Sequence, residues 1–197
     1  ELLDASRVRF LLGDIRDMDR LMMASEDINI IFHAAAFKHI PQGEYNPFEV
    51  IQTNVIGTQN LITTALKIPS VTHFVMISTD KAVEPVNTMG ASKLLAERLV
   101  SATHYMKGKK NKVFTTVRLG NVLGTSGSVL SLFNHQAKRG SLTITHPDMV
   151  RFFMTLEDAI NLIFDALMLA RGGEIFVPKM PPVAIKDLAH VYATRVS

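Results

Sequence analysis

Cysteine is absent from the 197-residue sequence. Its absence excludes a disulfide framework and cysteine-rich zinc sites, and it suits a reducing compartment. No apolar run reaches the ~20 residues that a membrane-spanning helix needs, and the sequence does not begin with a basic segment followed by an apolar one. The seven histidines show no spacing typical of metal ligands. We therefore expect a cytoplasmic location and no bound metal.

An excess of charge of one sign is also absent. The 21 basic and 18 acidic residues are well mixed and give a net charge of +3. The one dense basic cluster consists of Lys107, Lys109, Lys110 and Lys112. No aromatic residue interleaves with these lysines to stack on bases, and no known nucleic-acid motif accompanies them. We therefore interpret the cluster as a solvated loop and expect no nucleic-acid partner.

Helix and strand patterns alternate along the chain. The helical spacing of apolar residues is clearest in Pro47–Lys67, with Asn46 placed as its N-cap, and it recurs in Leu94–Tyr105 and Leu156–Leu169. A further helical pattern begins at Ile185. The predicted strands are Val8–Leu12, Ile28–Ala36, His73–Ser78 and Lys112–Leu119.

Continuous apolar strands separated by long helical connections are typical of a parallel sheet with helices on both faces. The sequence therefore predicts an α/β fold with a doubly wound parallel sheet. In this fold class, ligands bind beyond the carboxyl ends of the strands. The residues at the predicted strand ends, all expected on one edge of the sheet, are Gly13 with Asp14, Ala34–Ala36, Ser78–Lys81, and Gly120 with Asn121.

One of these strand ends carries an acid-base set. Thr79, Asp80 and Lys81 supply a hydroxyl, a carboxylate and an amine side by side. At another strand end, the small side chains of Ala34–Ala36 leave room for the close approach of a cofactor. Each feature also has an ordinary structural explanation. The alanines can serve tight packing, Asp80 and Lys81 can form a solvated pair, and Lys93 can be a helix-surface lysine.

Six segments of the sequence resemble the successive signatures of one enzyme family. They are GDIRD, FHAAAFKHIPQGEYNPFEVIQTNVIGTQNL, STDKAVEPVNTMGASKLLAE, RLGNVLGTSGSVLSLFNHQ, ITHPDMVRFFMTLEDAINLI and GGEIFVPKM, in this order. The family is the UDP-N-acetylglucosamine 4,6-dehydratases of bacterial polysaccharide biosynthesis, within the extended short-chain dehydrogenases and their Rossmann-like fold. The resemblance runs from about Val8 to Leu188.

The resemblance implies a reaction and a role for each member of the acid-base set. Such enzymes use NAD or NADP to oxidise the 4-hydroxyl of a UDP-N-acetylhexosamine. A base then removes the proton at carbon 5, an acid helps the 6-hydroxyl leave as water, and the hydride returns to carbon 6. Lys81 matches the base and Asp80 the acid. Thr79 matches a hydrogen bond at the sugar, and Lys93 matches the lysine that holds the nicotinamide ribose.

A lysine works as a base only if its pKa falls toward neutrality. Burial can lower the pKa of Lys81, and so can the charge of a nearby Lys93. This is a hypothesis about the local surroundings of Lys81.

The resemblance also implies binding residues. Asp14 and Ile15 match the adenine contacts. The other positions that match the lining of the cofactor are Ala34, Ala35, Ala36, Met89, Lys93 and Val122. The positions that match substrate contacts are Lys38, Thr79, Asp80, Asn121, Ser126, Gly127, Ser128 and Val129.

Arg151 is a further candidate for the substrate diphosphate. A guanidinium binds phosphate through two parallel hydrogen bonds, which a lysine cannot do. An ordinary surface ion pair with Glu157 or Asp158 explains this arginine equally well.

Two features depart from the pattern of the superfamily. A tyrosine normally stands four residues before Lys93, but this position is Met89, which can neither take nor give a proton. A membrane-anchored branch of the family commonly carries methionine there, so we expect Asp80 or Lys81 to serve the oxidation step. The glycine-rich fingerprint that seats a pyrophosphate is missing, since the cluster Gly120–Gly127 has the wrong spacing. The chain is therefore expected to lack the first βαβ unit and an N-terminal membrane anchor of its parent enzyme.

These observations predict the organisation and function of the chain. Residues 1–125 are a partial dinucleotide-binding domain with the catalytic loop, and residues 126–197 are mostly a substrate-binding part, truncated at the C-terminus. The expected function is 4,6-dehydration of a UDP-sugar by a homo-oligomer with NAD or NADP. One alternative is a nucleotide-sugar 4-epimerase, which normally needs the missing tyrosine and has no need of an Asp-Lys pair. The alternative of another class is a non-catalytic fragment with a structural or oligomerisation role.

Overall fold

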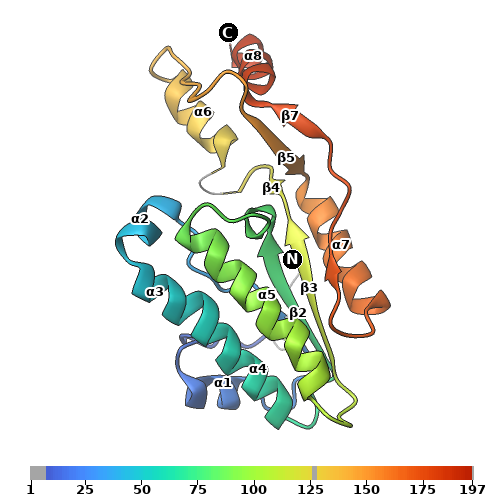
Figure 1. Ribbon diagram of the computed structural model, residues 1–197. Coiled ribbons are helices and arrows are strands. Elements are labelled where there is room, and N and C mark those ends of the chain that lie inside the picture. Colours follow the sequence, from blue (N-terminus) through green and yellow to red (C-terminus); the bar gives the residue numbers. More distant parts are fainter. Residues whose placement is uncertain (1–7, 126–127, 197) are drawn as a thin grey trace.

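Four parallel strands form the main sheet of the computed structural model, which describes residues 8–125 and 128–196 (Figure 1). Strands β2 and β3 pair in register from His73 opposite Val113 to Thr79 opposite Leu119, so both end at the same level. The strands, in their order across the sheet, are β1 (Ile30–His33), β2 (His73–Thr79), β3 (Val113–Leu119) and β6 (Ile175–Phe176).

Helices cover both faces of this sheet. On one face, Phe74 and Met76 pack with buried residues of α4 (Gly57–Lys67) and α5 (Thr88–Met106). On the other face, Val75 and Val117 pack against α7 (Leu156–Leu169). The predicted doubly wound α/β fold is confirmed. The shorter helices on the side of α4 and α5 are α1 (Met18–Ala24), α2 (Ile40–Tyr45) and α3 (Pro47–Ile51).

A smaller sheet lies beyond the carboxyl end of β3 (Figure 1). In it, β4 pairs parallel with β5, and β5 pairs antiparallel with β7. Phe133 of α6 packs with Ile185 and Ala189 of α8 in a separate apolar cluster. The domain boundary at 125/126 stays a prediction. The elements of this part are β4 (Asn121–Val122), α6 (Val129–Ala137), β5 (Val150–Met154), β7 (Pro182–Ala184) and α8 (Ile185–Val196).

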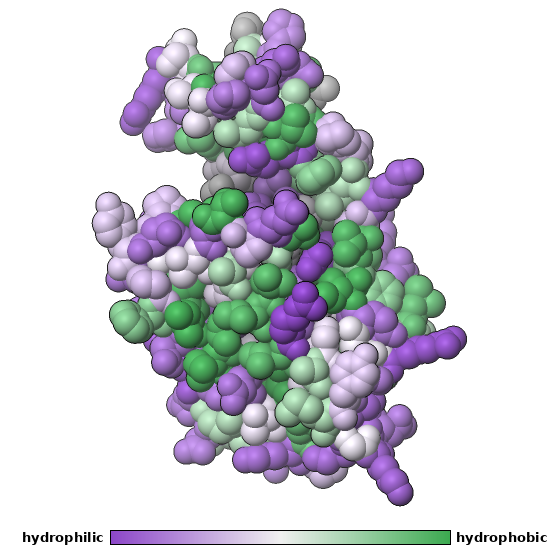
Figure 2. Space-filling view, viewed as in Figure 1, coloured by the Kyte–Doolittle hydropathy of each residue, from purple (hydrophilic) through white to green (hydrophobic). Residues whose placement is uncertain are grey.

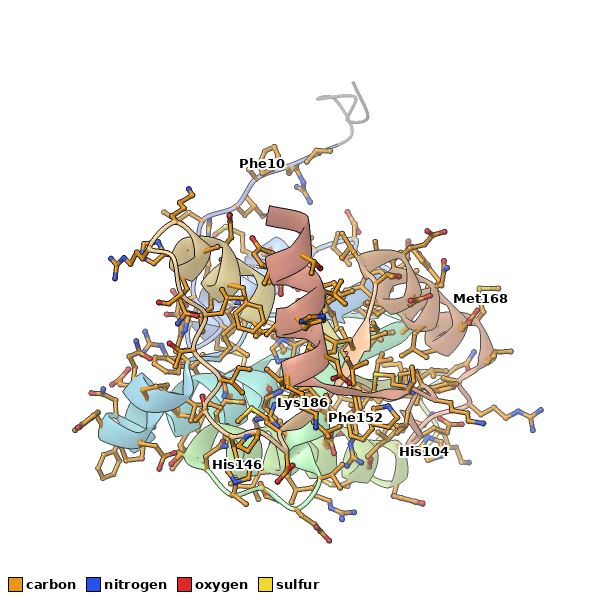
Figure 3. All side chains as sticks on the ribbon, turned by 90° about the horizontal axis from the view of Figure 1, so that it is seen from above. Phe10, His104, His146, Phe152, Met168 and Lys186 are labelled. Carbon is orange, nitrogen blue, oxygen red and sulfur yellow. The ribbon has the colours of Figure 1, made fainter. Side chains whose placement is uncertain are left out.

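The predicted strand at Val8–Leu12 is wrong. This segment forms no strand, and among the described residues no neighbouring strand pairs with it. Phe10 and Leu12 are 87% and 93% exposed, and Phe10 stands on an extended segment away from the body of the molecule (Figure 3). An apolar run becomes a strand only where another strand satisfies its backbone N–H and C=O groups.

The predicted helix Pro47–Lys67 forms with two differences. Asn46 stands at the N-cap as predicted, but its side chain donates to the carbonyl of Gln42 at 2.9 Å and makes no capping bond. A π turn, η2 (Gln52–Ile56), separates α3 from α4 and turns Asn54 toward the interior. Single π turns inside helices are frequent at functional sites.

The basic cluster is not simply a solvated loop, which corrects that interpretation. Lys112 is only 6% exposed, and its Nζ donates to the carbonyls of Ile68 and Val71 at 2.6 and 2.5 Å. Lys107 Nζ donates to the carbonyl of Lys112, and Lys110 Nζ to that of Leu66 at 3.0 Å. The amines of Lys110 and Lys112 therefore satisfy carbonyl groups near the end of α4 and in the turn that leads to β2.

Figure 2 shows apolar side chains gathered on the surface formed by α3, α4 and α5. Phe48 is 81% exposed there, and Leu95 is 53% exposed. Patches of this kind are typical of surfaces that contact other molecules. The predicted homo-oligomer stays a prediction. Among the described residues, no helix is both long enough and apolar enough to cross a membrane.

Candidate active site

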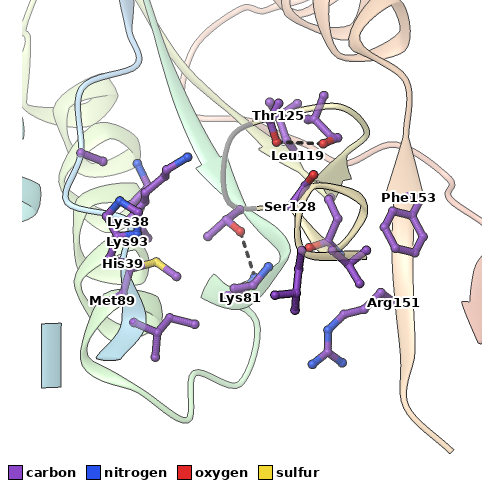
Figure 4. A pocket seen from close by; sticks show the side chains of 18 of the residues that line it. Lys38, His39, Lys81, Met89, Lys93, Leu119, Thr125, Ser128, Arg151 and Phe153 are labelled. Atoms are coloured by element: carbon purple, nitrogen blue, oxygen red, sulfur yellow. Dashed lines mark hydrogen bonds between the residues drawn. The ribbon is translucent and has the colours of Figure 1, made fainter. Parts of the chain in front are cut away.

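A pocket of about 760 Å³ opens where β1, β2 and β3 end. Its volume is in the range of small-molecule sites. Figure 4 shows Lys93 and Met89 on one side, Arg151 and Phe153 on the other, and Lys81 between them. The predicted site residues that line this pocket are Ala34, Ala36, Lys38, Thr79, Lys81, Met89, Lys93, Asn121, Val122, Ser128, Val129 and Arg151.

The end of β2 places the acid-base set at the pocket. After Thr79, a short 3₁₀ turn, η3 (Asp80–Ala82), reverses the chain. Oδ1 of Asp80 accepts hydrogen bonds from Nζ of Lys81 and from the hydroxyl of Thr79, both at 2.9 Å. The side chains of Lys81 and Asp80 are 32% and 19% exposed. The pair is thus partly buried and joined by a hydrogen bond, and its catalytic role stays a prediction.

Lys93 is a buried residue of α5 rather than a helix-surface lysine. It is 6% exposed, and its Nζ donates to the carbonyl of Ile77 at 2.6 Å. Burial lowers the pKa of Lys93 to about 8, because leaving water disfavours the charged amine, and the negative charge of Glu97 opposes this shift. Burial, together with the positive charge of Lys93, lowers the pKa of His33 to about 3. His33 is therefore neutral at physiological pH.

The segment after β1 forms another wall and is held by Asn54. The Asn54 side chain accepts from the N–H of Phe37 at 2.7 Å and donates to the carbonyl of the same residue at 3.0 Å. It also donates to the hydroxyl of Ser92 at 2.9 Å. The π turn therefore joins the backbone next to Lys38 to the helix that carries Lys93.

The third wall comes from β4, α6 and β5. Asn121 donates from Nδ2 to the carbonyl of Phe152 at 3.0 Å. Nη1 of Arg151 donates to the carbonyl of Val150 at 2.8 Å, and within the described part of the chain Arg151 forms no ion pair with Glu157 or Asp158. The surface-pair explanation of Arg151 is wrong. Ser126 and Gly127, both predicted substrate contacts, lie outside the described residues.

Four predicted site residues do not line the pocket: Asp14, Ile15, Ala35 and Asp80. Asp14 instead binds Arg16, and these hydrogen bonds hold its pKa below the usual range of a carboxyl group. Ile15 packs against Gly57, where its side chain occupies the space that a Cβ on Gly57 would need. Asp80 stands between the pocket-lining Thr79 and Lys81 and accepts a hydrogen bond from Nζ of Lys81. The predicted adenine contacts of Asp14 and Ile15 stay predictions.

The charge of the pocket lining has one sign. No acidic side chain is present among the described residues that line it. Such a lining attracts an anion. No group of three potential metal ligands occurs in residues 8–125 and 128–196. The basic residues of the lining are Lys38, His39, Lys81, Lys93 and Arg151.

Sequence reasoning missed several residues of the site. Asn54 and Glu97 are buried polar residues in helical segments that also bury apolar side chains. A polar residue on an apolar helix face is a signal that could have found both. The apolar wall carried no comparable signal, because the same residue types fill any core. Its residues are Leu132, Phe133, Met149, Phe153 and Ile185.

Comparison with protein families gives a match over almost the entire chain. The family described as "Polysaccharide biosynthesis protein" matches residues 3–196. A protein from Methanocaldococcus jannaschii, "Uncharacterized membrane protein MJ1061", is 54% identical over 96% of this chain and 57% of its own length. A "UDP-N-acetylglucosamine 4,6-dehydratase (inverting)" from Campylobacter jejuni is 41% identical over 98% of this chain and 58% of its own. A "UDP-glucose 4-epimerase" from Rickettsia typhi is 42% identical over 95% and 55%.

Solved structures show the same fold. "Pen" from Bacillus thuringiensis is 45% identical, with a TM-score of 0.93 over 98% of this chain and 61% of that one. "DesIV (dTDP-glucose 4,6-dehydratase)" from Streptomyces venezuelae, solved with NAD and TYD bound, is 25% identical, with a TM-score of 0.88 over 98% and 65%. The Rossmann-like fold is therefore confirmed. The chain spans a little over half the length of the curated relatives described above.

Proposed function

The chain belongs to the polysaccharide biosynthesis protein family, and we propose that it forms the catalytic part of an NAD-dependent 4,6-dehydratase of a UDP-N-acetylhexosamine. One observation carries the proposal: Lys81, Lys93 and Arg151 line a single basic pocket at the carboxyl ends of parallel strands. The substrate class follows from the similarity to the Campylobacter jejuni enzyme, and the dinucleotide from the NAD in the Streptomyces venezuelae structure.

The residues at the end of β1 fit the nicotinamide end of the cofactor. Ala34 and Ala36 line the pocket with side chains too small to block a planar ring. Lys93 lies on the same side of the pocket as Met89 and supplies a buried amine for hydrogen bonds to a ribose (Figure 4). NAD, when bound, would accept a hydride from carbon 4 of the sugar and could later give it back. We also propose that the dinucleotide is NAD rather than NADP.

The diphosphate of the substrate is proposed to bind at the Arg151 side of the pocket. A guanidinium can offer two parallel N–H groups to phosphate oxygens. Ser128 and Val129 begin α6, and Ser128 caps it by accepting from the N–H of Ser131. The sugar then lies between Arg151 and Lys93, next to Lys81. In this position the apolar residues of β5 and α6 exclude water from the reacting atoms.

The proton steps are assigned to the residues that follow β2. Oxidation at carbon 4 also releases the proton of the 4-hydroxyl, which Lys81 takes as a neutral amine and passes to the carboxylate of Asp80 along their hydrogen bond of 2.9 Å. Lys81 then takes the proton from carbon 5, which the neighbouring 4-keto group makes acidic, and Asp80, as the acid, gives its proton to the 6-hydroxyl, which leaves as water. When the hydride returns to carbon 6, Lys81 gives its proton back to carbon 5, so both residues end as they began. Thr79 donates to the same Oδ1 and fixes the orientation of the carboxyl group.

A 4-epimerase is the second candidate, because the Rickettsia typhi relative bears that name. Epimerisation needs oxidation and reduction at carbon 4 alone. It gives no task to a base at carbon 5 or an acid at the 6-hydroxyl. The hydrogen-bonded Asp80 and Lys81 pair therefore favours dehydration.

Nuclear magnetic resonance of the sugar products tests the proposal. UDP-N-acetylglucosamine and NAD are incubated with this chain and, in parallel, with this chain joined to the part of the Campylobacter jejuni relative that the match leaves out. A 4-keto-6-deoxy sugar is the expected product. Lys81→Met is expected to abolish it, since methionine preserves the length of the side chain without the amine.

Lys109→Met is the matched control, because this lysine is exposed and does not line the pocket. It should form product at the rate of the unchanged enzyme. Interconversion of the 4-epimers without loss of the 6-hydroxyl would favour the epimerase. Full activity of Lys81→Met would refute the role given to this residue.

A further inference from the structure

Glu97 is a fully buried carboxylate near the pocket, and it has no role in the proposed reaction. It is 0% exposed, on the side of α5 that faces the sheet. It accepts three hydrogen bonds: from the hydroxyl of Ser78 at 2.6 Å, and from Nε and Nη2 of Arg118 at 2.9 and 2.6 Å. Three charge-assisted hydrogen bonds from two strands compensate this carboxylate for the water it loses inside an apolar layer.

The donors to Glu97 stand directly before the strand ends that form the pocket. Ser78 on β2 precedes Thr79–Lys81, and Arg118 on β3 precedes the pocket-lining Leu119. Glu97 itself lies one helical turn after Lys93. One carboxylate therefore joins α5 to the ends of two strands at the level where all three contribute to the pocket.

The charge of Glu97 also acts on the Lys93 amine. Groups from several elements face this amine: the carbonyl of Ile77 on β2, the neutral His33 on β1, Glu97 on α5, and Lys81 across the pocket. Of these, Glu97 is the group whose negative charge favours the protonated amine. Arg118 neutralises part of that charge, because it binds the same carboxylate through two nitrogens.

We propose that Glu97 is a positioning residue of the pocket: its carboxylate fixes α5 against the ends of β2 and β3 and places a negative charge one helical turn from Lys93. The ordinary alternative is an ion pair that only stabilises the fold. The two differ in one respect: an ion pair with a purely structural role leaves the titration of Lys93 unchanged when it is replaced by a neutral pair of similar volume. The test needs neither cofactor nor substrate, so its failure leaves the proposed reaction untouched.

The titration is measured on the whole chain, with carbon-13 at Cε of its lysines, from about pH 6 to pH 11. The Lys93 resonance is assigned with Lys93→Arg. In Glu97→Gln, Lys93 is expected to lose its proton at lower pH than in the unchanged chain. Glu49→Gln is the matched control. It removes a carboxylate from the exposed ion pair with Arg16 and should leave the Lys93 titration where it is.

Glu97→Gln leaves Arg118 buried without its charged partner and can therefore misfold, so a second variant is needed. The double variant Glu97→Gln with Arg118→Met removes both charges together. A smaller shift of Lys93 in the same direction, to lower pH, is expected, because the charge of Arg118 is removed as well, with faster amide exchange at Thr79–Lys81 and unchanged exchange in α7. A Lys93 titration equal to that of the unchanged chain in this folded double variant would overturn the proposal.

Discussion

The α-carbon of Gly90, in the first turn of α5, faces the carbonyl oxygen of Lys81 so closely that a Cβ at position 90 would collide with it. The Asn87 side chain caps this helix by accepting from the N–H of Gly90 at 2.8 Å. The start of α5 and the turn that carries Lys81 therefore fix each other's position.

Gly90→Ala is expected to displace the Asp80–Ala82 turn. Overpacking of this kind costs about 1 to 3 kcal/mol of stability, and a shift of a catalytic group by about 1 Å lowers the rate about a hundredfold. Urea unfolding and dehydratase turnover measure the two effects. Ala102→Gly, at an exposed position of the same helix, serves as control, since it lowers stability by about 1 kcal/mol and should spare turnover. Equal turnover losses in the two variants would contradict the prediction.

Lys93 is expected to make stability depend on pH. Its pKa falls from 10.5 to about 8 on folding, because burial disfavours the charged amine. Between these values the unfolded chain holds a proton that the folded chain has lost. The free energy of unfolding therefore rises with pH in this window, by at most about 1.4 kcal/mol per pH unit from this group. Below about pH 8 the penalty for burying the charge is fully present.

Lys93→Met removes this dependence. Urea unfolding of the variant and of the unchanged chain, at several pH values across the window, isolates the contribution of Lys93 from those of other groups. The difference in unfolding free energy between the two proteins should change with pH. For the control Lys109→Met it should stay constant. A constant difference for Lys93→Met would mean that the amine keeps an ordinary pKa.

Lys112 is expected to contribute to stability although it belongs to a basic surface cluster. Lys112→Met leaves the carbonyls of Ile68 and Val71 without their buried donor, at 2.6 and 2.5 Å in the structure. The loss is expected to be about 2 kcal/mol. Lys109→Met, from the exposed part of the cluster, should change stability by less than about 0.5 kcal/mol. Thermal unfolding of the two variants checks this, and equal stability would restore the solvated-loop interpretation.

Arg151 is expected to contribute to binding rather than to chemistry. Calorimetry with UDP should show about tenfold to hundredfold weaker binding to Arg151→Met, because a bond to a charged phosphate is worth about 1.5 to 3 kcal/mol. In turnover assays KM should rise while kcat stays close to its original value. Arg139→Met, at an exposed position after α6, is the control. Unchanged affinity in Arg151→Met would place the diphosphate elsewhere.

The regular elements were predictable wherever a local pattern determines them. Leu156–Leu169 forms with the predicted bounds, because its apolar spacing agrees with a capping box between Thr155 and Asp158. The runs at His73 and at Val113 are strands, since each is rich in β-branched and apolar residues and buries consecutive side chains, as a strand covered on both faces does. The convergence of their ends followed from the parallel arrangement alone.

Only the tertiary structure decided which polar groups meet. Val8–Leu12 has the apolar pattern of a strand, yet strand formation depends on a partner that no local pattern specifies. Glu97, Ser78 and Arg118 are far apart in the sequence, and their contact depends on the register between β2, β3 and α5. Lys93 and Lys112 look like ordinary surface lysines in the sequence, but packing buries both. The sequence by itself determined the elements and the edge at which they present their chemistry, because period and capping act over a few residues. Burial, charge state and hydrogen-bond partners needed the fold, because they depend on residues brought together from distant parts of the chain.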